Sequence, residues 1–332
     1  MPDALLDIRG LMVRFKTPEG IGRAVEMVDL SMAPGETLGL VGESGCGKSV
    51  TALAVMGLVP SPPGRVTGEA IRFDGLDLLH ADNETRRRIR GRDIGMIFQE
   101  PMTALNPVMT IGRQVAEPLM THLGLSQTEA LSKAARWLDR VRIPSAKSRL
   151  GTYPHELSGG MRQRVMIAMA MICRPRLLIA DEPTTALDVT TQRQILALMA
   201  SLKVELNTAM LLITHDLGVV AQTAGHMAVM YAGRVVESAG VDALFAKPLH
   251  PYTRGLLKSM PRLGVKRERL SEIPGTVPAA TETITGCAFA GRCPSVMDYC
   301  RLHAPMLEKI EPEHRVRCWL YDAVGSKTQF KT

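Results

Sequence analysis

Apolar and polar positions repeat with two different periods along the chain, and each change of period marks an expected boundary between strand and helix. Short apolar runs predict buried strands at 37–42, 69–73, 93–98, 177–182, 208–214, 227–231 and 234–238. Apolar positions three and four residues apart predict helices at 127–141, 161–173 and 190–206. Strands that alternate with helices in this way indicate an α/β fold.

Three regions depart from this alternation. Residues 4–41 are β-rich, with turns expected at Pro18-Glu19-Gly20 and Pro34-Gly35. Residues 100–160 open with a proline-punctuated loop and continue with helical periodicity, which predicts an inserted helical subdomain. After about residue 240, eight prolines and four of the six cysteines fall in a segment that is expected to be rich in loops.

The most specific motif is a glycine-rich stretch between the strand 37–42 and a helix that begins near Val50. It reads Gly42-Glu43-Ser44-Gly45-Cys46-Gly47-Lys48-Ser49. Glycines let the backbone wrap closely around a polyphosphate, so that N–H groups and the helix N-terminus face its negative charge. Lys48 can then reach the outer phosphates, and the Ser49 hydroxyl can ligate Mg²⁺. A glycine-rich turn that binds nothing is the alternative, but the complete spacing and its context predict a nucleotide site.

Two carboxylates, Asp181 and Glu182, end the apolar strand 177–182. Ligands of open α/β sheets bind at the carboxyl ends of the strands. Asp181 is therefore expected to hold Mg²⁺, directly or through water, and Glu182 to polarise an attacking water. An acidic pair at the surface is the alternative, and the phosphate-binding loop makes it the weaker interpretation.

One turn and two single residues have both a functional and a structural interpretation. Ser158, Gly159 and Gly160 precede the helix 161–173 and form either an anion site at its N-terminus or an ordinary N-cap and turn. His215 follows the strand 208–214, where it could orient water or sense the γ-phosphate, although a lone His is more often structural. Phe15 could stack on a base or pack in a core.

Composition narrows the classes of protein that fit. At 332 residues, with 45% hydrophobic residues, the chain can form one large domain or two to three smaller ones. No apolar run approaches the roughly 18 residues of a membrane span, and no signal segment begins the chain, so a cytoplasmic protein is expected. The net charge of +7 fits nucleic acid, a membrane surface or a solvated face. Arginines concentrated at 86–92 lack interleaved aromatic residues, which favours an exposed helix face.

The motifs together resemble those of the ATP-binding cassette (ABC) ATPases over roughly residues 5 to 240. The resemblance rests on the order of the loop 42–49, Gln99, the Leu157–Gly160 signature, the strand 177–182, Ala186-Leu187-Asp188 and His215. It implies a P-loop NTPase ABC cassette with a RecA-like core, a β subdomain and an inserted helical subdomain. Met161 stands where many members have Gln, a variant that the resembled subgroup tolerates.

Site roles follow from this resemblance. In the family, two cassettes enclose two ATP molecules, each between the phosphate-binding loop of one subunit and the signature of the other. The loop 42–49 and Val50 would then bind ATP, Gln99 would ligate Mg²⁺, Asp188 would lie at the dimer interface, and Phe15 would stack on adenine. Lys48, Glu182 and His215 would be catalytic, with Glu182 as the general base.

A narrower resemblance is to the ATPase subunits of oligopeptide, dipeptide and nickel importers. It rests on the sequence Gln-Glu-Pro-Met-Thr-Ala-Leu-Asn-Pro at 99–107, on His250–Thr253, on Ile273–Gly275 and on the cysteine-bearing tail. It implies a peripheral subunit on the cytoplasmic face of the inner (cell) membrane. A second, similar ABC ATPase would form a heterodimer with it beneath two transmembrane permease subunits, with the loop 100–112 near them. An extracytoplasmic solute-binding protein would deliver the solute, and no nucleic acid is implied.

The tail carries Cys287, Cys293, Cys300 and Cys318. In a cytoplasmic chain metal binding is a better interpretation than disulfides, and four thiolates suit either zinc or an iron–sulfur cluster. Free thiols are a third possibility. Close Cys-x2-Cys pairs are absent, and the resembled family carries a 4Fe-4S cluster here, which favours the cluster. Cys46 and Cys173 are expected to pack, with Lys48 and the helix N-terminus lowering the pKa of Cys46.

Three domains are therefore expected. They are a discontinuous nucleotide-binding core at 1–98 and 162–240, a helical subdomain with the signature at 99–161, and a small C-terminal extension at 241–332. The predicted function is ATP hydrolysis that drives uptake of di- or oligopeptides, or a related solute, through an ABC importer. The alternative is a soluble ABC-type ATPase acting on nucleic acid or ribosomes, which the single cassette without a coiled-coil insert disfavours. Intact Glu182 and His215 disfavour a non-catalytic regulatory cassette.

Overall fold

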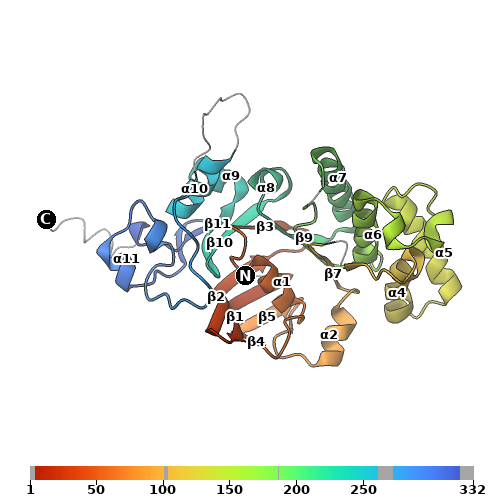
Figure 1. Ribbon diagram of the computed structural model, residues 1–332, viewed down its shortest axis with the longest axis horizontal. Coiled ribbons are helices and arrows are strands. Elements are labelled where there is room, and N and C mark those ends of the chain that lie inside the picture. Colours follow the sequence, from red (N-terminus) through yellow and green to blue (C-terminus); the bar gives the residue numbers. More distant parts are fainter. Residues whose placement is uncertain (1–3, 101–103, 186, 261–271, 322–332) are drawn as a thin grey trace. The chain divides into compact units, whose positions relative to one another are not determined.

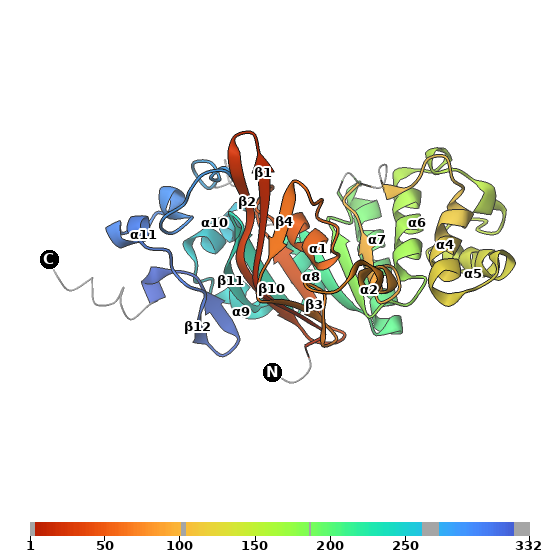
Figure 2. The same cartoon turned by 90° about the horizontal axis from the view of Figure 1, so that it is seen from below.

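In the computed structural model, residues 4–100, 104–185, 187–260 and 272–321 are described. The chain divides into two compact units, both drawn in Figures 1 and 2. The first unit contains Met32–Thr37 and His80–Ile213, and the second contains Leu6–Ser31, Leu38–Leu79 and the residues from Thr214 onward. In the described parts of the chain, no helix is both long enough and apolar enough to cross a membrane.

The first unit combines parallel strands with a group of helices. Its strands are β7 (Ile94–Ile97), β8 (Leu177–Asp181) and β9 (Ala209–Thr214), and its helices are α2 (Asn83–Ile89), α4 (Ile111–Leu123), α5 (Gln127–Arg140), α6 (Gly159–Met171) and α7 (Val189–Leu206), with short 3-10 turns η1 (Ser148–Gly151) and η2 (Pro154–Glu156). β8 pairs in parallel with β7 and with β9. All five residues of β8 are buried, as expected of a strand covered on both faces. The predicted α/β class is therefore confirmed.

Local sequence signals explain the helices of this unit. Ser126 caps α5 in a capping box, because its hydroxyl accepts from the Glu129 N–H while the Glu129 carboxylate accepts from the Ser126 N–H. α4 ends at Gly124 in the left-handed conformation, at φ 63°. α4 and α5 pack against α6, and Figures 1 and 2 show the three helices side by side.

The second unit contains two groups of paired strands. In one, the strand order is β2 (Gly20–Met32), β1 (Leu6–Thr17), β5 (Ala70–Phe73) and β6 (Leu76–Asp77), and β4 (Gly64–Thr67) also pairs with β1. In the other, the order is β12 (Glu308–Glu311), β13 (His314–Val316), β11 (Arg234–Gly240), β10 (His226–Tyr231) and β3 (Thr37–Val41). The helices are α1 (Lys48–Val55), α8 (Leu217–Thr223), α9 (Val241–Ala246), α10 (Pro251–Ser259) and α11 (Asp298–Leu302), with 3-10 turns η3 (Ala290–Arg292) and η4 (Trp319–Tyr321).

The C-terminal extension is rich in loops between residues 272 and 307, as its prolines predicted, and its two short strands continue the structure of the second unit. β13 pairs with β11, so residues more than seventy positions apart lie in one ladder. The Glu237 carboxylate is fully buried there. It accepts from the Leu249 and His250 N–H groups at 2.7 and 2.9 Å and lies 2.8 Å from His314 Nε2. These contacts satisfy a carboxylate that would otherwise destabilise the interior.

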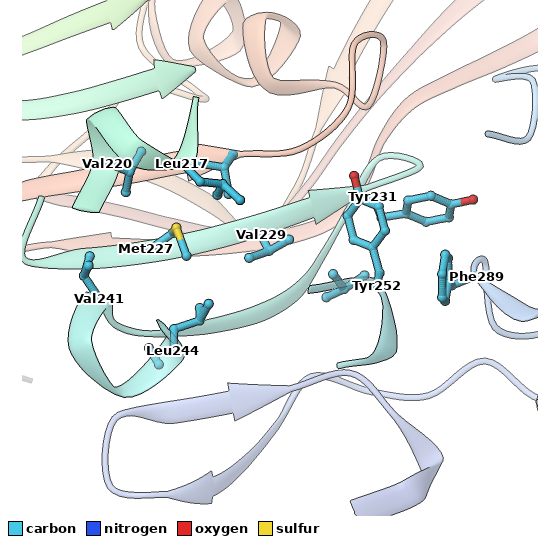
Figure 3. Close-up of a cluster of buried hydrophobic side chains, with 12 residues drawn as sticks. Leu217, Val220, Met227, Val229, Tyr231, Val241, Leu244, Tyr252 and Phe289 are labelled. Carbon is cyan, nitrogen blue, oxygen red and sulfur yellow. The ribbon is translucent and has the colours of Figure 1, made fainter. Parts of the chain in front are cut away.

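An apolar cluster in the second unit extends from β10 into the extension (Figure 3). It contains Met227 and Val229 of β10, Leu244 of α9, and three aromatic residues, Tyr231, Tyr252 and Phe289. The ring centroid of Tyr231 lies 4.7 Å from that of Tyr252 and 5.2 Å from that of Phe289. Edge and tilted aromatic contacts of this kind stabilise beyond the area that they bury. The extension is thus part of the core that supports β10.

Candidate functional site

The glycine-rich loop of the second unit has the geometry of a phosphate-binding loop. It follows β3 and leads into α1, whose N-cap is Gly47. Gly42 and Gly47 have φ of 154° and 104°. A Cβ on Gly42 would lie 2.1 Å from the Met230 carbonyl oxygen, and one on Gly47 would lie 2.3 Å from that of Ala24. Only glycine fits at these two positions, because both backbone conformation and space exclude a side chain.

Lys48 is buried inside this loop. Its Nζ donates to the carbonyl oxygens of Gly42 and Glu43 at 2.8 and 3.0 Å and contacts Cys46 Sγ at 3.7 Å. The ammonium group is thus fixed beside the loop backbone, where a polyphosphate would meet it. Ser49 and Val50 follow in the first turn of α1.

The pKa of the Cys46 thiol is raised, whereas Lys48 and the helix N-terminus were expected to lower it. The Cys46 side chain is fully buried, and burial raises the pKa of the thiol, while Lys48 acts in the opposite direction with a smaller effect. The expectation of a lowered pKa was wrong, because loss of hydration of the thiolate outweighs the attraction of one ammonium group. Cys46 is a buried packing residue, as predicted.

Residues 181 to 185 in the first unit form a second polar group. Asp181 is buried at the end of β8, opposite Ile213 of β9. Glu182 follows in a left-handed backbone conformation, at φ 45°. Its Oε2 accepts from Gln99 Nε2 at 3.3 Å and from the Thr185 hydroxyl at 2.9 Å. A non-glycine residue in this conformation requires support from its surroundings, and such residues gather at functional sites.

The contact between Gln99 and Glu182 joins residues from the ends of two adjacent strands. β7 and β8 are parallel, so their carboxyl ends lie at one edge of the sheet. Sequence reasoning named both residues but missed Thr185, whose only signal was its place in the turn after Glu182. Ala186 lies outside the described residues, as do Pro101, Met102 and Thr103.

The signature turn is exposed at the start of α6. Ser158 is the N-cap, and its hydroxyl accepts from the Met161 N–H at 3.4 Å. Ser158 and Gly159 are exposed, and Gly160 is half-buried. A Cβ on Gly160 would lie 2.8 Å from Thr191 Cγ2, so this glycine allows α6 to approach the start of α7 closely.

Asp188 is the N-cap of α7. Its carboxylate accepts from the N–H groups of Thr190 and Thr191, both at 3.0 Å, and from the Thr191 hydroxyl at 2.7 Å. The hydrogen bonds of Thr191 lower the pKa of Asp188. The residue therefore has a clear structural role as the cap of α7, and its place at a dimer interface stays a prediction.

His215 and Phe15 lie in the second unit. His215 is exposed between β9 and α8 and directly precedes Asp216, the N-cap of α8. Phe15 is half-buried in β1 opposite Gly64, and a Cβ on Gly64 would lie 2.9 Å from the ring. The predicted residues thus fall into two sets. The phosphate-binding loop, Phe15 and His215 belong to the second unit, whereas Gln99, the signature, Asp181, Glu182 and Asp188 belong to the first.

Besides burial, neighbouring cysteines of the extension contribute to the raised pKa of Cys287, Cys293 and Cys318. Burial raises the pKa of Cys287 to about 11 and that of Cys318 to about 12, and the other three cysteines contribute to the shift at Cys318. The Cys287 N–H donates to the Cys300 carbonyl oxygen at 2.7 Å. Within the described ranges, however, no group of three or more His, Cys, Asp or Glu side chains is arranged to hold a metal ion. The placement of the thiols does not support the predicted 4Fe-4S cluster.

Two residues of the extension touch the phosphate-binding loop and were not among the predicted site residues. The Glu43 N–H donates to the Tyr252 hydroxyl oxygen at 3.0 Å. Arg292 forms an ion pair with the Glu43 carboxylate at 2.7 Å. Tyr252 lay in a noted sequence motif, 250–253, and Arg292 directly precedes Cys293, but neither position gave a signal of contact with the loop.

The sequence of this chain is similar to known protein families and to individual known proteins. The model of a family described as ABC transporter matches residues 25–185, and that of the oligopeptide/dipeptide transporter C-terminal region matches residues 236–300. The probable peptide ABC transporter ATP-binding protein y4tR of Sinorhizobium fredii is 52% identical over 318 residues, which cover 96% of this chain and 95% of that protein. The oligopeptide transport ATP-binding protein OppD of Escherichia coli is 50% identical over 317 residues, with 96% and 93% covered.

Solved structures are also similar. One is a dimeric structure of a post-hydrolysis state of the ATP-binding cassette MJ0796 bound to ADP and Pi. It is 27% identical, has a TM-score of 0.64, and the similarity covers 71% of this chain and 98% of that one.

Proposed function

This chain belongs to the family of ABC transporter ATP-binding subunits with an oligopeptide/dipeptide transporter C-terminal region, and we propose that it drives uptake of di- or oligopeptides. It has the predicted ABC cassette fold and is an ATPase. One observation carries the nucleotide chemistry: Lys48 is fixed inside a glycine loop that admits no side chain at Gly42 or Gly47. The peptide relatives do not favour the alternative of a cassette acting on nucleic acid.

Hydrolysis is proposed to be an in-line attack of water on the γ-phosphate. Glu182 accepts the proton of that water, and its hydrogen bonds from Gln99 and Thr185 orient the carboxylate. Lys48 and the N–H groups of the loop stabilise the charge that develops on the phosphate oxygens. His215 is proposed to orient the water or sense the γ-phosphate.

Magnesium fits the oxygen donors that the chain supplies. Ser49, Gln99 and Asp181 provide hydroxyl, amide and carboxylate oxygens, which are the ligands that this hard cation prefers. Gln99 donates to Glu182 through Nε2, so its amide oxygen is the atom suited to a metal. When bound, Mg²⁺ would neutralise part of the phosphate charge.

Assembly with a second cassette is part of the proposal. Exposure of Ser158 and Gly159 suits a signature that contacts ATP held by another subunit, and Asp188 would lie at the interface. We further propose that the partner is a similar ATPase, that two permeases bind the pair through the segment 100–112, and that an extracytoplasmic protein delivers the solute. The chain would then act at the cytoplasmic face of the membrane. Phe15 would stack on adenine. The functional domains would be a nucleotide-binding core at 1–98 and 162–240, a helical subdomain at 99–161 and a C-terminal extension at 241–332.

As a finer point, we propose that the four cysteines of the extension hold a 4Fe-4S cluster. The support is that all four lie in one extension and that, in addition to burial, three of them raise the pKa of Cys318 by their charge. Iron, sulfide and zinc contents, measured after anaerobic purification, test it directly. Four iron atoms and four sulfides per chain, lost in Cys293→Ser, would support a cluster, whereas metal-free protein would refute it. Cys173→Ser, outside the extension, is the matched control.

Reconstitution tests the transport function. The tagged chain is recovered from its native membranes in mild detergent, and co-purifying proteins are identified by mass spectrometry. Two permeases and a second ATPase are expected, and vesicles containing the assembly should take up labelled peptides in an ATP-dependent manner that Glu182→Gln abolishes. Recovery of ribosomes or nucleic-acid proteins without permeases would overturn the proposal.

A further inference from the structure

Arg292 of the extension forms a bidentate ion pair with Glu43 of the phosphate-binding loop. Nη1 lies 2.7 Å from Glu43 Oε2, and Nη2 lies 3.1 Å from Glu43 Oε1. The Arg292 side chain is 7% exposed, so the pair is shielded from solvent on the arginine side. Bidentate pairs of this kind fix direction as well as distance, and they are stronger than single hydrogen bonds between neutral groups.

Arg292 also donates two hydrogen bonds to backbone carbonyl groups of the extension. Nε donates to the Pro274 carbonyl oxygen and Nη2 to that of Ile273, both at 3.0 Å. The guanidinium carbon lies 5.7 Å from the centroid of the Tyr231 ring. The arginine is therefore held in one orientation by the extension and by β10, and it presents a fixed surface to Glu43.

Glu43 is held from two further directions. Its N–H donates to the hydroxyl oxygen of Tyr252, which is fully buried in the cluster of Figure 3. Its carbonyl oxygen accepts from Lys48 Nζ at 3.0 Å. Side chain, N–H and carbonyl of one loop residue are thus all bonded, and two of the three partners come from beyond residue 250.

We propose that the C-terminal extension acts in cis as a clamp on the phosphate-binding loop, with Arg292 and Tyr252 as positioning residues for ATP. They fix the position of Glu43. The carbonyl oxygen of Glu43, which accepts a hydrogen bond from Lys48 Nζ, is thereby fixed as well. A loop that is already fixed loses less conformational entropy when the polyphosphate binds, so the clamp raises the affinity for ATP. The proposal rests on the assignment of residues 42–49 as the ATP site.

A merely structural ion pair would behave differently. If Arg292 only docked the extension, its loss would lower the melting temperature but would leave the ATP affinity of the folded protein unchanged. If Arg292 positions the loop, its loss should instead weaken the affinity for ATP, seen as a higher KM for ATP. The kcat should stay nearly unchanged, because the clamp does not touch the reacting atoms.

The experiment uses the full-length chain, with ATP binding measured by calorimetry and turnover measured in the assembled transporter. We expect Arg292→Met to raise the Kd for ATP by about tenfold and Arg292→Lys, which keeps the charge but loses the bidentate geometry, by about threefold. In both variants kcat should stay within about twofold of the original. Arg301→Met, at an exposed arginine of the same extension, is the matched control and should change neither value.

A double-mutant cycle identifies the contact responsible. Glu43→Gln combined with Arg292→Met should be no worse than Arg292→Met alone, because both changes remove the same interaction. Lys48→Ala in the same assay separates the assignment of the loop as the ATP site from the proposed clamp by the extension. An unchanged Kd in Lys48→Ala would overturn the loop as the ATP site, and the clamp with it. Lost binding there, combined with normal affinity in a folded Arg292→Lys and Arg292→Met, would overturn the clamp alone.

Discussion

The phosphate-binding loop is buried at Gly42 and at residues 46–48, whereas the signature turn is exposed at Ser158 and Gly159. Lys48 and Cys46 have 5% and 0% of their surface exposed, and Gly42 and Gly47 are crowded by Met230 and Ala24, which lie far away in the sequence. The Ser158 hydroxyl accepts a hydrogen bond from the Met161 N–H at the start of its own helix. The loop is thus a site preformed by one chain, and the signature is a surface suited to a second one.

The largest expected effect separates turnover from binding and concerns Glu182 in the first unit. In Glu182→Gln, kcat for ATP hydrolysis should fall on the order of 10³-fold, because the amide cannot accept the proton of water. The Kd for ATP should stay within about twofold, because the phosphate-binding loop is intact. Single-turnover hydrolysis and calorimetry measure the two values. Near-normal turnover would remove Glu182 from the role of base.

The next largest effect tests the crowding of the loop. Gly47→Ala should lower the free energy of unfolding by about 3 kcal/mol and weaken ATP binding, because the new Cβ would collide with the Ala24 carbonyl in an unfavourable backbone conformation. Denaturant unfolding and ATP titration are the measurements. Gly225→Ala is the control, since its Cβ would meet no atom within 4 Å. Equal stability of the two variants would show that the loop is less constrained than its contacts indicate.

A smaller effect concerns pH and the aromatic cluster behind the loop. His250 is buried, its Nδ1 accepts from the Tyr252 N–H, and burial lowers its pKa to about 3. Its unfolded pKa is about 6.5, so the unfolded chain takes up the proton first, and stability decreases as pH falls from about 6.5 toward 3. Between pH 7.5 and 5.5 this residue should account for a loss of about 1.4 kcal/mol.

His250→Asn isolates this contribution, because asparagine also caps a helix but does not titrate. The variant should lose less stability than the original between pH 7.5 and 5.5, as measured by chemical denaturation. The same loss in both proteins would mean that His250 is not the group that titrates.

The smallest effect concerns the cap of α7 beside the signature. Asp188→Ala should lower the free energy of unfolding by about 1 kcal/mol, because three hydrogen bonds to Thr190 and Thr191 are lost. Asp188→Asn should recover most of this stability, since asparagine is an equally good cap. If ATP hydrolysis by the assembled transporter stays low in Asp188→Asn despite restored stability, the carboxylate also acts at the interface between cassettes.

Much of the cassette could be predicted from the sequence because its signals are local. The strand, glycine loop and helix of 37–55 are encoded by adjacent residues, and so is the apolar strand that ends in Asp181 and Glu182. In the C-terminal extension the prolines correctly indicated loops. The pairing of β13 with β11 was missed, because no local pattern encodes it.

By itself, the sequence determined the class of fold, the order of the motifs and the identity of the phosphate-binding loop. Only the tertiary structure decided that the Cys46 thiol has a raised pKa and that Arg292 forms an ion pair with Glu43. It also decided that Glu182 adopts a left-handed conformation and accepts hydrogen bonds from Gln99 and Thr185. The reason is physical. Glycine conformation and helix caps depend on a few neighbouring residues, whereas burial, pKa and ion pairing depend on residues that meet only when the chain folds, here across 249 positions.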